Sequence, residues 1–196
     1  MTQRAQGPAN SLVFTAIRPG NAGSVAPLFT DFTSNNLGVP RNPAVPFYSE
    51  SRPDLYRYAA NPAGIHFIDK GVGAFLRGPD NVNSEWKQYA DSFDGKFQTT
   101  TLRNVDRRPR PDFVKAYMHN GYLKSLKEVV HFYNTRDTLG RCKSLDDPGA
   151  KVTCWSAPEI SQNLNKTIGR LGLTDKEEDQ IVTFLKTLTD GYRIAH

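Results

Sequence analysis

The sequence predicts a mostly α-helical chain in which a few helices are joined by long irregular segments. Two segments in the second half begin with a Ser/Thr-x-x-Glu pattern, which caps helix N-termini, and continue with apolar residues at helical spacing. The first third is different, because residues 1–64 contain eight prolines and no sustained helical period. Such a segment cannot build a core alone, so we expect it to wrap around the rest of the chain.

The first predicted helix is short and covers residues 85–93. Its apolar residues recur at positions i, i+3, i+4 and i+7, which places them on one face of a helix. They are Trp86, Tyr89, Ala90 and Phe93.

The second predicted helix begins after Ser125. The Ser125 hydroxyl can accept the amide of Glu128, whose carboxylate can reach back to the helix start. Four residues then share one inward-facing stripe, namely Leu126, Val129, Val130 and Tyr133.

The final predicted helix begins after Thr174, which forms a second capping box with Glu177. Leu173 is placed to act as a hydrophobic staple, and Gly191 is placed to end the helix. The inner stripe consists of Ile181, Val182, Leu185 and Leu188. Between the last two helices, residues 136–172 are expected to be irregular and held by the two cysteines.

Composition sets the broad class. A chain of 196 residues has room for one domain, and its charged and aromatic content argues against overall disorder. No apolar run approaches the ~18–20 residues of a membrane helix, which excludes an integral membrane protein. The net charge of +5 favours an acidic partner. The densest basic run, residues 103–110, lacks interleaved aromatics, so a solvated loop or partner-docking patch is favoured over nucleic-acid binding.

Cys142 and Cys154 lie twelve positions apart around an Asp-Asp-Pro-Gly turn sequence. This spacing matches neither a C-x-x-C redox motif nor a zinc pattern. We favour a disulfide, which would indicate an oxidising compartment, although no export signal is visible in the first twenty residues. The alternative is a pair of free, buried thiols.

The sequence contains no G-x-S-x-G, P-loop or H-E-x-x-H motif. The remaining candidates are potential metal or haem ligands, namely Met118, His119, His131 and Tyr133. On one helix His131 and Tyr133 point about 200° apart, so both cannot face one iron. Tyr133 is expected to point inward and His131 outward. In the simpler alternative, Tyr133 is a core residue and His119 belongs to a turn.

Four segments of the chain also resemble a known family. They are FTDFTSNNLGVPRNP at 29–43, DGKFQTTTLRNV at 94–105, AYMHNGYLKSLKEVVHFYN at 116–134 and LGLTDKEEDQIVTFLKTLTDGY at 171–192. Together they resemble the C-terminal haem domain of the bacterial dihaem cytochrome c peroxidase and MauG family. The resemblance assigns residues 27–196 to one domain and leaves 1–26 as a poorly defined N-terminal segment.

The resemblance implies a cytochrome c-like fold of few helices and long loops around haem c. In that family the haem of this domain relays electrons, while the haem of the other domain reacts with hydrogen peroxide. Tyr133 matches the distal ligand position, where family peroxidases usually carry Met and MauG-type proteins carry Tyr. Tyrosinate ligation lowers the haem potential relative to Met. Other positions implied to lie near the haem are Met118, the competing ligand, His119, Arg103 beside a propionate, and Asn36, Leu37, Gly38 and Pro40 along the haem edge.

The family's interdomain calcium maps to the backbone oxygens of Val114 and Ala116. The sequence departs from the family in lacking the C-x-x-C-H motif that attaches haem c and supplies its proximal His. It also lacks the N-terminal haem domain. We therefore expect either a C-terminal piece of a longer protein, which is favoured, or a degenerate homologue.

The leading interpretation is the electron-relay part of a periplasmic peroxidase or MauG-like oxidoreductase, with no catalytic residue of its own and little activity as an isolated chain. Its expected partners are the missing N-terminal haem domain, hydrogen peroxide and a redox protein that donates electrons or is oxidised. The alternatives are a haem-free binding or structural module and a monohaem electron carrier.

Overall fold

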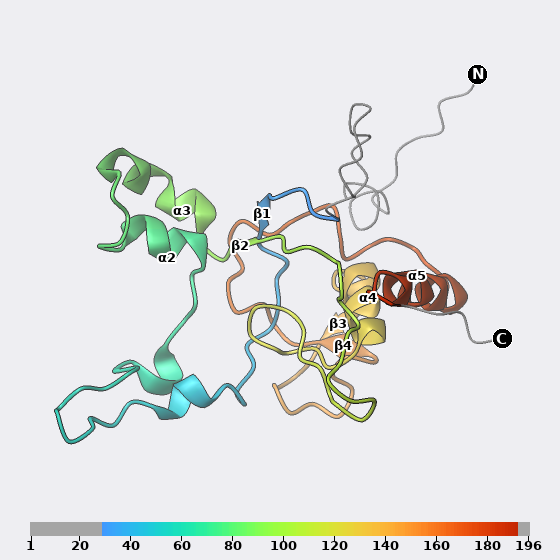
Figure 1. Cartoon of the computed structure of the whole chain (residues 1–196), viewed down its shortest axis with the longest axis horizontal. Coiled ribbons are helices and arrows are strands. Elements are labelled where there is room, and N and C mark those ends of the chain that lie inside the picture. The colour runs from blue at the N-terminus through green and yellow to red at the C-terminus, as the bar shows by residue number, and fades with distance from the viewer. Residues whose placement is uncertain (1–28, 192–196) are drawn as a thin grey trace.

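The computed structural model describes residues 29–191, which form a small helical core from which two lobes project (Figure 1). The predicted N-terminal segment 1–26 lies outside the described residues, as do residues 27–28 and 192–196 of the predicted domain. Helical residues make up 28% of the structure. The prediction of a mostly α chain is therefore only partly confirmed, since irregular segments outweigh the helices.

The core is built around two helices, α4 (Leu126–Thr135) and α5 (Asp175–Thr187), which pack against each other. Beneath them lies a parallel pair of short strands, β3 (Gly140–Arg141) and β4 (Cys154–Trp155). Trp155 is fully buried, meets Phe132 edge-to-face with ring centroids 4.9 Å apart, and donates from Nε1 to Thr135 Oγ1 at 3.0 Å. This contact anchors the irregular segment after α4 to the helix itself.

The caps of the two helices explain where each begins. Ser125 Oγ accepts the amide of Glu128 at 3.1 Å, but the Glu128 carboxylate accepts from the amide of Lys124, one residue before the position expected. On α5 the predicted capping box is complete, with Thr174 and Glu177 each bonding the other's backbone amide. Both predicted helix starts are confirmed.

The two ends of α5 differ in detail from the prediction. The residue that would complete a staple with Leu173 is the polar Glu178, so Leu173 is held instead by Asn134, which bonds both its amide and its carbonyl. The helix ends at Thr187 with Leu188, not Gly191, as its C-cap, and the Leu188 amide closes a tight last turn onto the carbonyls of Leu185 and Lys186.

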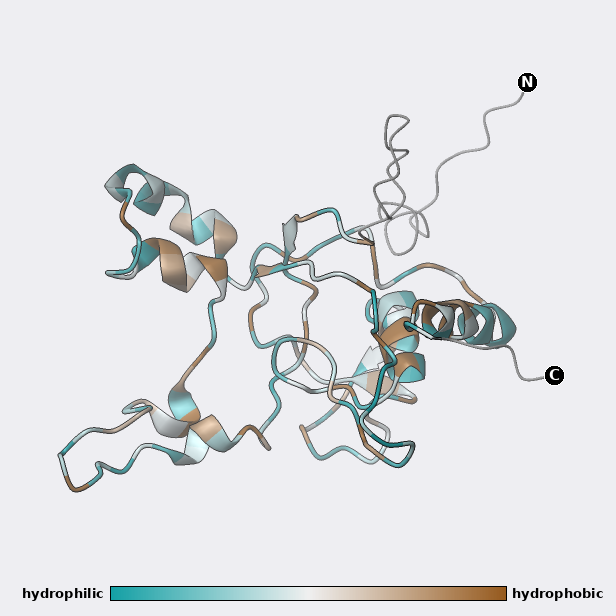
Figure 2. Ribbon diagram, in the orientation of Figure 1, coloured by the Kyte–Doolittle hydropathy of each residue, from teal (hydrophilic) through white to brown (hydrophobic). Residues whose placement is uncertain are grey.

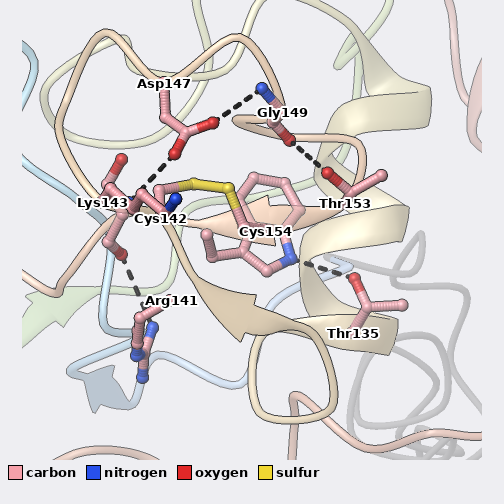
Figure 3. The surroundings of a disulfide bond; sticks show 10 residues. Thr135, Arg141, Cys142, Lys143, Asp147, Gly149, Thr153 and Cys154 are labelled. Carbon is pink, nitrogen blue, oxygen red and sulfur yellow. Dashed lines mark hydrogen bonds between the residues drawn. A yellow bond between two sulfur atoms is a disulfide. The ribbon is translucent and has the colours of Figure 1, made fainter.

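The segment between α4 and α5 is irregular, as predicted, and contains the disulfide Cys142–Cys154 (Figure 3). Asp147 stabilises the intervening turn, because its carboxylate accepts the amides of Lys143 at 3.0 Å and Gly149 at 2.9 Å. The disulfide therefore joins the start of this turn to strand β4.

Both lobes are formed by the chain between the short strands β1 (Ser34–Asn35) and β2 (Phe97–Gln98), and these two strands pair antiparallel. The first lobe holds the 3-10 helices η1 (Pro46–Ser49) and η2 (Gly64–His66). The second holds α2 (Val72–Arg77), the 3-10 helix η3 (Ser84–Tyr89) and α3 (Ala90–Phe93). Within the described range, no helix is both long and apolar enough to cross a membrane.

The predicted helix at 85–93 is thus a 3-10 turn followed by one α turn. Its apolar face is only partly buried, since Ala90 is 2% exposed whereas Trp86 and Tyr89 are 48% and 53% exposed. Hydropathy colouring shows apolar residues along both lobes, away from the core (Figure 2).

Candidate functional site

A cavity of about 590 Å³ lies between the α4–α5 pair and the β1–β2 ribbon. Its size is typical of a small-molecule or cofactor site. Most of its wall is apolar, with a minority of polar side chains. The apolar lining includes Leu37, Val39, Phe97, Leu102, Val105, Ile160 and Ile168, together with residues of both core helices.

The predicted inner stripe of α4 forms one wall. Leu126, Val129, Val130 and Tyr133 all line the cavity, and Ile181 and Leu185 of α5 continue the same wall. The helical spacing read from the sequence therefore placed Tyr133 correctly.

Burial and nearby charges perturb Tyr133, and its phenol makes no hydrogen bond to another residue of 29–191. Burial raises the pKa of Tyr133 to about 12, the positive charge of Arg136 opposes this shift, and Asp31 reinforces it. At neutral pH the side chain is a neutral phenol whose oxygen lone pairs remain available to a ligand.

Met118 and His119 reach the same cavity from the turn before α4. Met118 has a left-handed backbone, with φ of 69°, and the turn closes through the Gly121 amide and the Met118 carbonyl. The His119 ring stacks on Phe97 at 3.7 Å between centroids. Burial lowers the pKa of His119, with Asp69 opposing the shift, which favours a neutral imidazole. Three potential iron ligands thus line one cavity.

His131 points away from this cavity, as predicted, but toward α5 rather than into solvent. Its Nδ1 lies 3.0 Å from Glu178 Oε1, because α5 packs on that face of α4. His131 does not line the cavity and is therefore no candidate ligand for a group bound there.

Only part of the segment predicted to lie along the haem edge lines the cavity. Asn36 and Leu37 line the cavity, whereas Gly38 and Pro40 do not. Gly38 has φ of 71°, and a Cβ there would lie 2.9 Å from Leu164 Cδ2. Pro40 is fully buried and its carbonyl accepts from Asn120 Nδ2 at 2.8 Å.

Arg103 and Val114 are also absent from the cavity wall, although Leu102, Val105 and Ala116 belong to it. Val114 is 67% exposed. Within residues 29–191, the only cluster of three side chains with metal-ligand spacing is Cys142, Asp147 and Cys154, whose sulfurs are bonded to each other. The described residues thus provide no carboxylate cluster for calcium near Val114 and Ala116.

Arg136 does not line the cavity but supports its wall, and sequence reasoning missed it. It is 2% exposed and donates to the carbonyls of Leu37 at 2.8 Å and Asn165 at 2.7 Å, while Asp137 receives its Nε and Nη2. Asn36 makes a parallel link, donating to the carbonyls of Ile160 and Gln162. These bonds hold together the two segments that form the cavity wall opposite α4.

Comparisons with known proteins agree with this arrangement. No family model matches the chain. The methylamine utilization protein MauG of Paracoccus denitrificans is 29% identical over 164 residues, covering 83% of this chain and 35% of MauG. The cytochrome-c peroxidase IdrP1 of Denitromonas iodatirespirans is 27% identical over 191 residues, covering 92% of this chain and 40% of IdrP1.

A solved structure shows the same likeness in three dimensions. A Tyr-to-Met variant of the diheme peroxidase BthA from Burkholderia thailandensis superimposes with a TM-score of 0.53 and 26% identity, over 84% of this chain and 34% of that protein. The chain is therefore related to MauG and the dihaem peroxidases, as the sequence segments indicated. It spans 35–40% of the length of these two curated relatives.

Proposed function

We propose that this chain is the C-terminal, electron-relay part of a dihaem cytochrome c peroxidase or MauG-like oxidoreductase, and that Tyr133 is the distal ligand of its haem. The observation that carries the proposal is the unpartnered phenol of Tyr133 on the wall of a cavity of cofactor size. The relationship to MauG and to cytochrome-c peroxidases supports the reaction class.

The residues of the cavity fit a haem. The wall is largely apolar, and Tyr133, His119 and Met118 offer oxygen, nitrogen and sulfur donors from two separate elements. When bound, haem would supply one-electron redox chemistry. Tyr133 would hold the iron, which requires its phenol to release a proton, and His119, stacked on Phe97, would offer a neutral imidazole in the same cavity.

Covalent attachment needs residues that this sequence does not contain. Its two cysteines are paired with each other, which leaves neither free to form a thioether. The proximal histidine and the thioethers would have to come from a C-x-x-C-H segment outside this sequence. We expect the chain alone to hold little or no haem.

The wider assignment follows from the proposed role. The disulfide supports an oxidising compartment, the periplasm, and the length of the relatives supports a second, N-terminal haem domain as partner. That domain would react with hydrogen peroxide, and a redox protein would exchange electrons with this one. A haem-free binding module remains the second candidate, because neither cysteine of the chain is available for haem.

The test compares two variants of a haem-bearing form, made by supplying a C-x-x-C-H segment upstream. We expect six-coordinate ferric haem with His and tyrosinate ligands. Tyr133→Phe should open the distal position or change its ligand, whereas Met118→Leu should leave the ferric spectrum unchanged. The opposite pattern would make Met118 the ligand. A spectrum insensitive to both substitutions would return Tyr133 to a packing role.

A further inference from the structure

Glu159 is a carboxylate in the cavity wall that has no ion-pair partner among the described residues. Its Oε1 accepts one long hydrogen bond, 3.4 Å from the Tyr48 hydroxyl. Its Oε2 is buried and has no hydrogen-bond partner. Its backbone amide is fixed on the Val39 carbonyl at 3.1 Å. An ionised carboxylate held this way is poorly stabilised, because burying a charge is costly unless it is paired.

The groups that face Glu159 do not stabilise its ionised form enough to offset the burial. The Arg41 guanidinium lies over the Tyr48 ring, 4.2 Å from its centroid, and donates to the Ile65 carbonyl instead of pairing with the carboxylate. Asp69, which precedes α2, adds negative charge nearby. Burial raises the pKa of Glu159, and Asp69 adds to this shift, whereas Arg41 and the Tyr48 hydroxyl oppose it. The pKa of Tyr48 is itself raised by burial, so Tyr48 remains a neutral donor.

We propose that Glu159 is a proton-binding residue of the cavity, taking up a proton when an electron enters the site and releasing it when the electron leaves. This inference rests on the proposed redox function. An external one-electron donor reduces the proposed haem, a hydronium ion of the solvent loses a proton by breaking one O–H bond and leaves as water, and the bond formed is O–H on the Glu159 carboxylate. The electron adds negative charge close to Glu159, where the low dielectric strengthens the interaction and favours the neutral acid.

The sign of the effect follows directly. Protonation of Glu159 stabilises the reduced state more than the oxidised one. The reduction potential should therefore fall as pH rises through the interval in which Glu159 titrates. Below and above that interval the potential should depend less on pH.

The first test uses the chain as it is and needs no haem. Carboxyl ¹³C NMR across pH should show one glutamate with a midpoint above the ordinary value of ~4.3, and Glu159→Gln should remove that resonance. Tyr48→Phe deletes a hydrogen bond that lowers the pKa, so it should raise the midpoint further. Glu177 is the internal reference, because the amide and hydroxyl of Thr174 lower its pKa. An ordinary or lowered midpoint for Glu159 would overturn the proposal.

The second test measures reduction potential against pH in the haem-bearing form. Wild type and the matched variant Glu177→Gln, which lies at the exposed start of α5, should show the same pH-dependent fall. Glu159→Gln should abolish it. An unchanged slope in Glu159→Gln would contradict the coupling. If the spectrum shows no Tyr133 ligation, the proposed ligand assignment fails, while the carboxyl titration still decides whether Glu159 binds a proton.

Discussion

Tyr133 faces opposite requirements with and without iron. In the chain alone, burial raises its pKa to about 12, so the phenol should resist ionisation. Burial also raises the pKa of Tyr48 and Tyr117, so alkaline titration followed by tyrosinate absorbance should show several late-titrating groups, one of which Tyr133→Phe removes. Because the folded-state pKa lies above the unfolded value of ~10, the stabilising contribution is complete below pH ~10 and is lost as pH rises toward 12. Unfolding by urea at several alkaline pH values should show a smaller loss of stability in Tyr133→Phe.

An early, ordinary titration of Tyr133 would mean that water reaches its hydroxyl freely. Tyr122→Phe offers a control within the core cluster, because Tyr122 is also buried but does not line the cavity. Tyr122→Phe should leave the late titration of Tyr133 unchanged.

Sequence patterns correctly placed those side chains whose position follows from helical periodicity. Tyr133 was placed by the same stripe that placed Val129 and Val130. Arg136 was missed because a buried arginine bonded to distant carbonyls leaves no pattern of spacing in the sequence. Arg103 was assigned by resemblance alone, and nothing local in the sequence could show that it would lie off the cavity wall.

Between α4 and α5 lies a polar cluster that fixes one helix on the other. Glu178 is 2% exposed, and its carboxylate receives Asn134 Nδ2 at 2.7 Å and lies 3.2 Å from Lys127 Nζ. Burial lowers the pKa of Lys127, but the hydrogen bonds that its ammonium donates to Asp175, Asp179 and Glu178 outweigh this effect and raise the pKa overall. The cluster holds α4 from the side opposite the cavity, and so supports the orientation of Tyr133.

Removing the buried carboxylate should therefore be costly. Glu178→Ala leaves the Asn134 amide and the Lys127 ammonium without it, and we expect a loss of about 1–3 kcal/mol in the free energy of unfolding. The neighbouring Asp179→Asn removes an exposed ion pair with the same lysine and should cost no more than ~1 kcal/mol. Urea denaturation compares them, and equal losses would show that Glu178 contributes no more than a surface charge.

At the element scale, capping patterns predicted both long helices because their energetics are local. Ser125 and Thr174 cap as expected. The end of α5 was misplaced because the Asn104 amide bonds the Leu188 carbonyl from 84 residues away in sequence, a contact that no local rule includes. The helix at 85–93 broke into two turns for a similar reason, as it packs on α2 rather than on the main core.

The described chain has one covalent cross-link, the disulfide, which closes the twelve-residue loop between Cys142 and Cys154. Protein recovered from an oxidising compartment, denatured without reductant, should give no free thiol in a thiol titration. Reduction should cost about 2–3 kcal/mol through the entropy of the closed loop. Two reactive thiols in the unreduced sample would refute the pairing.

Calcium should bind weakly to this chain alone. Val114 and Ala116 offer two carbonyls, whereas calcium requires about six to eight oxygen ligands. Isothermal calorimetry should detect no micromolar or tighter calcium site, and finding one would overturn the prediction. The same titration with magnesium controls for non-specific binding to exposed carboxylates.

The bonds of Asn36 and Arg136 also determine when the cavity can exist. Asn36 reaches carbonyls 124 and 126 positions later, and Arg136 joins Leu37 to Asn165. The N-terminal wall segment around Asn36 and Leu37 is therefore fixed only when the later segment that contains Asn165 is in place. The cavity can close only when residues up to 165 are present, and contacts so far apart in sequence form slowly. Enclosure of any large cofactor by this wall therefore requires segments 36–37 and 160–168 to have come together first.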